Sequence, residues 1–275
     1  MKRVWCVLPA LLLLAQTAVS QDVVREISHV KGDVYRFQNR FHVSVFTITG
    51  AGVVVSDPIN ADAVKWLKPE IAKLTAQPVT TLIYSHSHLD HASGGGAWGA
   101  LDTVVAHENA PADIDGVAPT RRFSDQLTLT VGDKTFELTY LGPGHGKDLI
   151  ATVIRPENVA FVVDAVSVRR LFYRDFGNAN VDDWIKQVRN IEGLDFDVFV
   201  GGHGPVGTRS DVSAGLEYLT TLRAEVLSGL RAGLSVDALA EEVLMEDYSE
   251  WGAYDRWREL NVRGMARFLS LTGAQ

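Results

Sequence analysis

Cysteine is almost absent from this 275-residue chain, and the only one is Cys6. With a single cysteine the chain can form no internal disulfide, even in an oxidising compartment. If that residue is removed by processing, cysteine is also excluded as a nucleophile and as a metal ligand. Stability must then come mainly from a hydrophobic core, and a content of 46% hydrophobic residues is enough for one globular domain with an appendage.

Removal of Cys6 is expected because the first twenty residues have the three regions of an export signal. Lys2 and Arg3 give a basic start, the run 4–15 is apolar except for one proline, and 18–20 is a series of small residues. An apolar run of this length is shorter than the roughly 20 residues that span a bilayer. We therefore expect residues 1–20 to be a cleaved signal peptide and the protein to be periplasmic or secreted. An uncleaved membrane anchor is the alternative.

Positive charge is also scarce. The formal net charge is −8 at pH 7, and removal of Lys2 and Arg3 takes it to −10. No cluster of lysine and arginine is visible, whereas nucleic-acid binding requires one to neutralise phosphates. We therefore expect a small-molecule substrate, no nucleic-acid partner and no stable membrane association after signal cleavage. The sequence does not indicate an oligomeric state.

Short β-rich runs and amphipathic helical patterns alternate from residue 21 to about 210. The clearest helical patterns cover 61–74 and 181–191. This mixture predicts an α/β (α+β) layer architecture with buried sheets. Residues 211–275 have leucines and aromatic residues at helical spacing, which predicts a helical C-terminal extension packed on the domain at 21–210. A substrate lid or a dimer surface is the alternative for the apolar stripe that contains Trp257.

The segment from His86 to His91 is the strongest chemical signal in the chain. A buried strand is predicted just before it, and within six positions it supplies three imidazoles and one carboxylate. These are ligands that zinc takes in sites that activate water. Three further candidates each follow a predicted strand, and a rigid strand end can fix the geometry of a ligand. The candidates are His86, His88, Asp90, His91, His145, Asp164 and His203.

The order His-x-His-x-Asp-His, then His, Asp and His, resembles the metallo-β-lactamase superfamily. The resemblance covers roughly 34–207 and implies an αββα sandwich with two zinc ions per chain. It implies that the first zinc is held by His86, His88 and His145, that the second is held by Asp90, His91 and His203, and that Asp164 bridges the two. Asp57 resembles the acid that orders the ligand loop in this superfamily, although an acid that merely forms a turn is an equal alternative.

Such a site predicts hydrolysis by metal-bound hydroxide, with Asp90 as the catalytic residue that passes a proton to the leaving group. The expected substrate is a cyclic or activated carbonyl compound such as a β-lactam, a lactone or a related ester or thioester. A dimetal phosphodiesterase and a mononuclear-iron sulfur dioxygenase of the same fold are the alternatives, and the complete second ligand set disfavours the latter.

Differences between this sequence and several branches of the superfamily narrow the choice of subfamily. The branch of β-lactamases with a cysteine ligand is excluded, and flavodiiron proteins have glutamate where His88 stands. Glyoxalase II has the same ligand set, but its glutathione substrate is mainly cytoplasmic. Lactonases and cysteine-free exported β-lactamases remain, and the latter generally lack a bridging acid, so a bridging Asp164 would favour a lactonase-like or unassigned hydrolase.

Residues just after Asp164 are candidates for contact with the substrate. Arg169 or Arg170 could hold a substrate carboxylate, and Phe172 or Tyr173 could cover the bond that is cleaved. A solvated loop with one buried aromatic residue is the competing interpretation. No motif surrounds the remaining histidines, which we expect to be structural or exposed: His29, His42 and His107.

Overall fold

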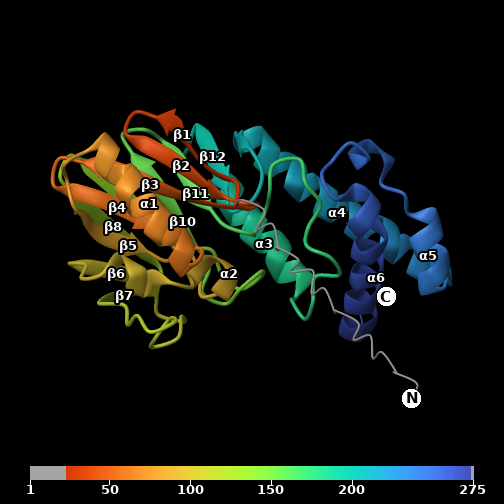
Figure 1. Ribbon diagram of the computed structural model, residues 1–275. Helices are drawn as coiled ribbons and strands as arrows, with labels where there is room; N and C mark the ends of the chain where they lie inside the picture. The colour runs from red at the N-terminus through yellow and green to blue at the C-terminus, as the bar shows by residue number, and fades with distance from the viewer. Residues whose placement is uncertain (1–22, 274–275) are drawn as a thin grey trace, which may run out of the picture.

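Two β-sheets packed face to face form the centre of the protein, with helices on both outer surfaces (Figure 1). The structure is a computed structural model that describes residues 23–273. The expected signal peptide at 1–20 lies outside the described residues, so its cleavage stays a prediction. No helix between residues 23 and 273 combines the length and the apolar character needed to cross a membrane.

The first sheet has its seven strands in sequence order. Its first four strands form an antiparallel meander, and the following pairs are parallel. The strands are β1 (Arg25–Lys31), β2 (Val34–Asn39), β3 (His42–Thr49), β4 (Gly52–Ser56), β5 (Val79–Ile83), β6 (Thr103–His107) and β7 (Arg121–Phe123).

The second sheet has six strands within residues 23–273, of which β11 and β12 are parallel neighbours and the other neighbouring pairs are antiparallel. In spatial order they are β13 (Val206–Gly207), β12 (Val198–Gly201), β11 (Val159–Val162), β10 (Ile150–Arg155), β9 (Lys134–Tyr140) and β8 (Gln126–Val131). Side chains from the inner faces of both sheets form one continuous apolar layer, in which Val45 and Ile83 of the first sheet belong to the same cluster as Phe136 and Phe161 of the second. This layer holds the sheets together, because apolar area removed from water is the main stabilising contribution to such a sandwich.

Helices cover the outer face of each sheet, as the alternation of apolar and polar residues predicts. The helix at 61–74 begins after Asn60, whose side chain accepts a hydrogen bond from the amide of Ala63, and it packs on the first sheet. The helix at 181–192 packs on the second sheet. The helices are α1 (Ala61–Leu74), α2 (Leu89–Ala92), η1 (Gly95–Trp98), α3 (Val181–Glu192), α4 (Arg209–Arg231), α5 (Val236–Glu242), η2 (Glu246–Tyr248) and α6 (Tyr254–Thr272).

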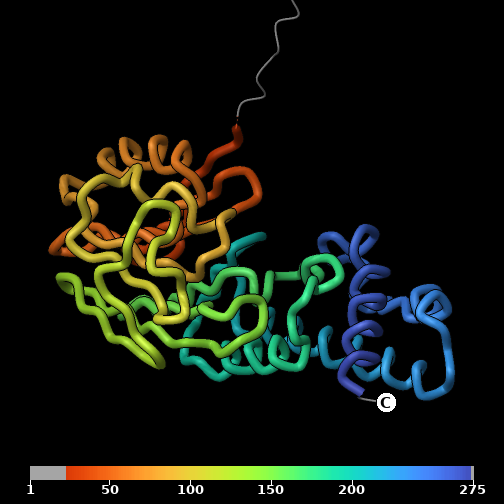
Figure 2. Tube along the Cα trace, turned by 90° about the horizontal axis from the view of Figure 1, so that it is seen from below, coloured from red at the N-terminus to blue at the C-terminus, as the bar shows by residue number. Residues whose placement is uncertain are grey.

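The last three α-helices extend from one end of the sandwich, where the blue part of the chain lies beyond the sheets (Figures 1 and 2). Helix α4 begins at Arg209 with a capping box between Thr208 and Asp211. Helix α6 is joined to α4 by a hydrogen bond of 2.7 Å from the buried Tyr218 hydroxyl to the side chain of Asn261. The predicted fold, an αββα sandwich with a helical C-terminal extension, is confirmed.

Candidate metal centre

The predicted ligand residues gather at one edge of the sandwich, because each follows the carboxyl end of a strand that points to that edge. His86, His88 and the short helix α2 follow β5, while Asp164 and His203 follow the parallel strands β11 and β12. The two sheets are tied together at this edge by a backbone hydrogen bond of 2.8 Å from Val43 to Gly202. The edge is therefore a rigid platform on which side chains from distant segments meet.

Four side chains form a first group: His86, His88, His145 and Asp164. Ring nitrogens of His88 and His145 face each other at 3.0 Å, and the Nε2 atom of His145 lies 3.3 Å from a carboxylate oxygen of Asp164. His86 is fully buried, and its Nε2 atom has no hydrogen-bond partner. Nitrogen and oxygen atoms that converge in this way, with a buried nitrogen left unsatisfied, fit a bound cation.

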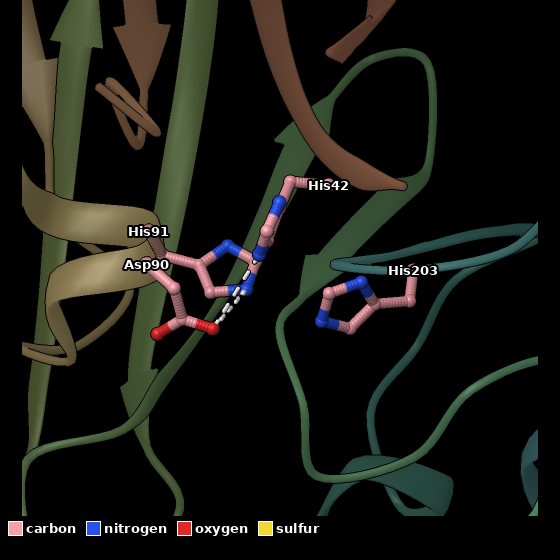
Figure 3. Close-up of side chains that lie close together, drawn as sticks. All are labelled: His42, Asp90, His91 and His203. Atoms are coloured by element: carbon pink, nitrogen blue, oxygen red, sulfur yellow. Dashed lines mark ion pairs between the residues drawn. The ribbon is translucent and has the colours of Figure 1, made fainter. Parts of the chain in front are cut away.

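A second group contains His42, Asp90, His91 and His203, and Figure 3 shows these four side chains turned toward one another. The Oδ2 atom of Asp90 lies 3.5 Å from Nε2 of His42 and 3.8 Å from Nε2 of His91. His91 is buried, and neither of its ring nitrogens has a hydrogen-bond partner. This donor set also fits a cation.

Asp164 lies between the two groups and faces both. Its Oδ2 atom is 3.3 Å from His145 and 3.7 Å from His86, whereas its Oδ1 atom is 3.0 Å from His203 and 3.3 Å from His91. The residue has a positive φ of 60°, which is uncommon for aspartate and is found mainly where surrounding structure imposes it. One carboxylate thus connects both sets of imidazoles.

The sequence did not indicate His42 as part of the site, and the structure places this residue, expected to be structural or exposed, in the second group of candidate ligands. It is the first residue of β3, and the β2–β3 hairpin brings it to the same edge as His203. Its position directly before a predicted strand was the only available signal. The expectation holds for the other two histidines, since His107 is buried against Tyr140 and His29 bonds to a backbone carbonyl of its own hairpin.

Asp57 is fully buried behind the ligand loop. Its two carboxylate oxygens accept hydrogen bonds from the backbone amide (2.8 Å) and the hydroxyl (2.6 Å) of Ser85, and that hydroxyl is 2.9 Å from Nδ1 of His86. Burial raises the pKa of Asp57 to about 6, although the nearby His91 and the hydrogen bonds from Ser85 act in the opposite direction. The contacts show that Asp57 anchors the start of the loop.

Gln187 of α3 gives similar support to the His145 loop, and the sequence did not single it out. It is completely buried, accepts a hydrogen bond from the amide of His145 (3.0 Å) and donates one to the carbonyl of Gly142 (2.8 Å). The neighbouring Trp184 packs edge-on against the His145 ring with centroids 5.0 Å apart. The sequence signal that could have pointed to Gln187 was a glutamine on the apolar face of an amphipathic helix.

Burial and close pairs of opposite charge dominate the electrostatics of the site. Burial lowers the pKa of His86 well below its usual value. Burial also acts to lower the pKa of His91, but the carboxylates of Asp164, Asp57 and Asp90 outweigh it and raise the pKa to about 9. The contact with His42 lowers the pKa of Asp90 to about 2, so this carboxylate is ionised at neutral pH.

A cavity of about 1400 Å³ opens from the two groups toward the C-terminal helices. Of the residues predicted to meet substrate, Arg170, Phe172 and Tyr173 line it. Arg169 is exposed and does not line it; its backbone carbonyl instead pairs with the amide of Gly252 at 2.8 Å. The cavity is large enough for a small organic substrate.

Comparison with known proteins shows which family the chain resembles. The model of the metallo-beta-lactamase superfamily matches residues 51–203, more than half of the chain. The chain is 33% identical over 173 residues to the 2,4-dinitroanisole O-demethylase subunit alpha of Nocardioides sp. (strain JS1661), an overlap of 60% of this chain and 52% of that protein. The chain therefore spans about half the length of this relative.

A second relative is the metallo-beta-lactamase type 2 of Elizabethkingia meningoseptica, which is 27% identical over 214 residues and overlaps 70% of this chain and 83% of that protein. Among solved structures, a metallo-beta-lactamase from Pontibacter korlensis superposes with a TM-score of 0.64 at 21% identity, covering 72% of this chain and 99% of that one. That likeness supports the fold. The chain belongs to the metallo-β-lactamase superfamily, whose members are generally metal-dependent hydrolases.

Proposed function

We propose that the protein is an exported, zinc-dependent hydrolase that cleaves a cyclic or activated carbonyl compound, such as a β-lactam, a lactone or a related ester or thioester. The observation that carries the proposal is the Asp164 carboxylate, which has one oxygen directed to each histidine group. A site with one metal would not need two complete sets of donors joined in this way.

In this proposal His86, His88 and His145 hold the first zinc, and Asp90, His91 and His203 hold the second. Asp164 would offer one oxygen to each ion, and His42 would offer a further nitrogen at the second site, as the geometry of the two groups supports. Two such cations supply an activated water molecule and polarise a substrate carbonyl. The candidate ligands at the first site are therefore His86, His88, His145 and Asp164. Those at the second site are His42, Asp90, His91 and His203, with Asp164 shared between the sites.

The chain's own groups have separate tasks in the reaction. The side chain of Asp90 is 54% exposed and lines the cavity, so its carboxylate is placed to take a proton from water and pass it to a leaving group. Asp57 and Gln187 contact no substrate and act as positioning residues, because they fix the loops that carry His86 and His145.

The two named relatives suggest which substrates to test first. One bears the name of a β-lactamase, and the other is named for the O-demethylation of an activated aryl ether. A panel of nitrocefin, a lactone, a thioester, a bis-phosphodiester and 2,4-dinitroanisole therefore covers the proposed class and its competitors. We expect hydrolysis of a carbonyl substrate; cleavage of the phosphodiester alone would favour the dimetal phosphodiesterase.

Metal analysis of the same preparation tests the proposed centre. We expect about two zinc ions per chain, loss of the first-site ion in His145→Ala and loss of the second-site ion in His203→Ala. One tightly bound iron that is insensitive to His203→Ala would instead indicate a mononuclear oxygenase. Export is tested by the intact mass of protein from its native host, which should begin at Gln21; a chain that retains Met1 would contradict signal cleavage.

A further inference from the structure

The cavity that contains the two histidine groups has a second wall, formed in part by helix α6. There the Trp257 ring lies edge-on to Tyr173, with centroids 5.3 Å apart. Two guanidinium groups lie over the Trp257 ring, Arg170 at 4.7 Å and Arg256 at 5.5 Å from its centroid. Arg256 and Trp257 belong to the helical extension, beyond residue 203 where the family match ends.

Among the residues that the structure describes, both guanidinium groups lack a partner of opposite charge. Within residues 23–273, neither Arg170 nor Arg256 forms an ion pair or a side-chain hydrogen bond. The acids in the same cavity are already engaged, since Asp175 pairs with Arg267 at 2.8 Å and Asp183 with a lysine of its own helix at 2.9 Å. Burial, together with the charge of Arg256, lowers the pKa of Arg170. An anion bound beside both groups would offset their like charge.

The loop that carries Arg170 is held in place before any ligand arrives. The amide of Leu171 donates to the carbonyl of Gly252 at 3.0 Å, and the buried Asn261 of α6 donates to the carbonyl of Phe172 at 3.0 Å. Arg267 of α6 also donates to backbone carbonyls further along this loop. Preorganisation of this kind lowers the entropic cost of binding a ligand.

We propose that Arg170 and Arg256 form an anion subsite over Trp257, which holds a carboxylate of the substrate while the bond to be cleaved lies at the histidine groups. A planar guanidinium matches a carboxylate in bidentate fashion, and the Trp257 and Tyr173 rings offer an apolar surface to the adjoining part of the molecule. The substrate class is thus an organic carboxylate that carries a second, hydrolysable group. The carboxylate is inferred from the contacts described above, and only the hydrolysable group rests on the proposed function.

Calorimetric titration of the protein as purified, with its metals, tests the subsite without turnover. Benzoate, its neutral counterpart benzamide and phenyl phosphate are the probes. We expect benzoate to bind at least about tenfold more tightly than benzamide, and R256Q or R170Q to remove most of that preference. The matched control is R263Q, on the same helix, because Arg263 already pairs with Asp237 at 2.7 Å and Glu259 at 2.8 Å. It should bind benzoate as the wild type does.

Arg256 is exposed, so R256Q keeps the test valid even if R170Q does not fold. Equal affinity for benzoate and benzamide would overturn the proposal. So would a benzoate preference that survives R256Q, since it would place the anion at the metals alone. Tighter binding of phenyl phosphate than of benzoate would overturn the assignment to carboxylates. A protein that hydrolyses none of the panel substrates fails the proposed function, but its titration still decides the subsite.

Discussion

Gly202 joins the two sheets through its carbonyl and lies against His91 and Asp164, so an added methyl group there should damage both the fold and the second histidine group. A Cβ atom on this residue would lie 2.5 Å from a methyl carbon of Val163, 3.0 Å from the His91 ring and 3.1 Å from Oδ1 of Asp164. Val163 is completely buried between the sheets, and the Gly202 carbonyl is fixed by its hydrogen bond from Val43. Neither side can move away at low cost.

We therefore expect Gly202→Ala to reduce the free energy of unfolding by about 1–3 kcal/mol, the usual cost of overpacking a tight interior. The side chains that can yield are His91 and Asp164, so we also expect at least about a tenfold loss of affinity at the second metal site. Urea unfolding in the presence of a chelator measures the first effect. Metal titration of the folded protein measures the second.

Gly201→Ala is the matched control, because it adds the same methyl group one residue earlier. Its Cβ atom would meet nothing closer than the carbonyl of His203 at 3.3 Å, and neither glycine has a positive φ that alanine would avoid. The control should lose less than about 1 kcal/mol and keep both metals. Equal damage from both substitutions, or an unchanged Gly202→Ala protein, would refute the steric reasoning.

Three further outcomes follow from the same contacts. Gln187→Leu should weaken first-site metal affinity by about 10- to 100-fold and leave the second site intact, as judged by metal titration, because only the His145 loop loses its anchor. Asp57→Asn should keep the fold but slow turnover, and a rate equal to that of the wild type would show that the Ser85 contacts do not position His86. In the metal-free protein the pKa of His91 is raised to about 9, so its charged form stabilises the fold fully below about pH 6.5, and this contribution is lost as the pH rises through 9. Urea midpoints between pH 6.5 and 9.5 should fall for the wild type and stay flatter for His91→Asn.

Much of the sandwich is predictable from sequence because buried strands and amphipathic helices leave local patterns. The helix predicted at 61–74 has those bounds in the structure, and the one at 181–191 is extended by one residue. The edge strand β1 is hard to predict from the sequence because its residues are mostly half-buried or exposed, with no apolar run to indicate a strand. The short strands β7 and β13 are equally hard to predict, since runs of three and two residues carry no periodicity.

The ligand loop was predictable because its residues lie within six positions, whereas other parts of the site depend on contacts between distant segments. His42 lies near Asp90 only because the β2–β3 hairpin brings it to this edge, and no motif near residue 42 indicates a ligand. Trp257 shows the same limit in a helix. Its spacing predicted packing on the body of the domain, and it does pack on Tyr173, but only the folded chain brings Arg170 and the metal groups to the same cavity. Periodicity predicts which face of a helix is covered, but not whether the space over that face is filled by the core or left for a ligand.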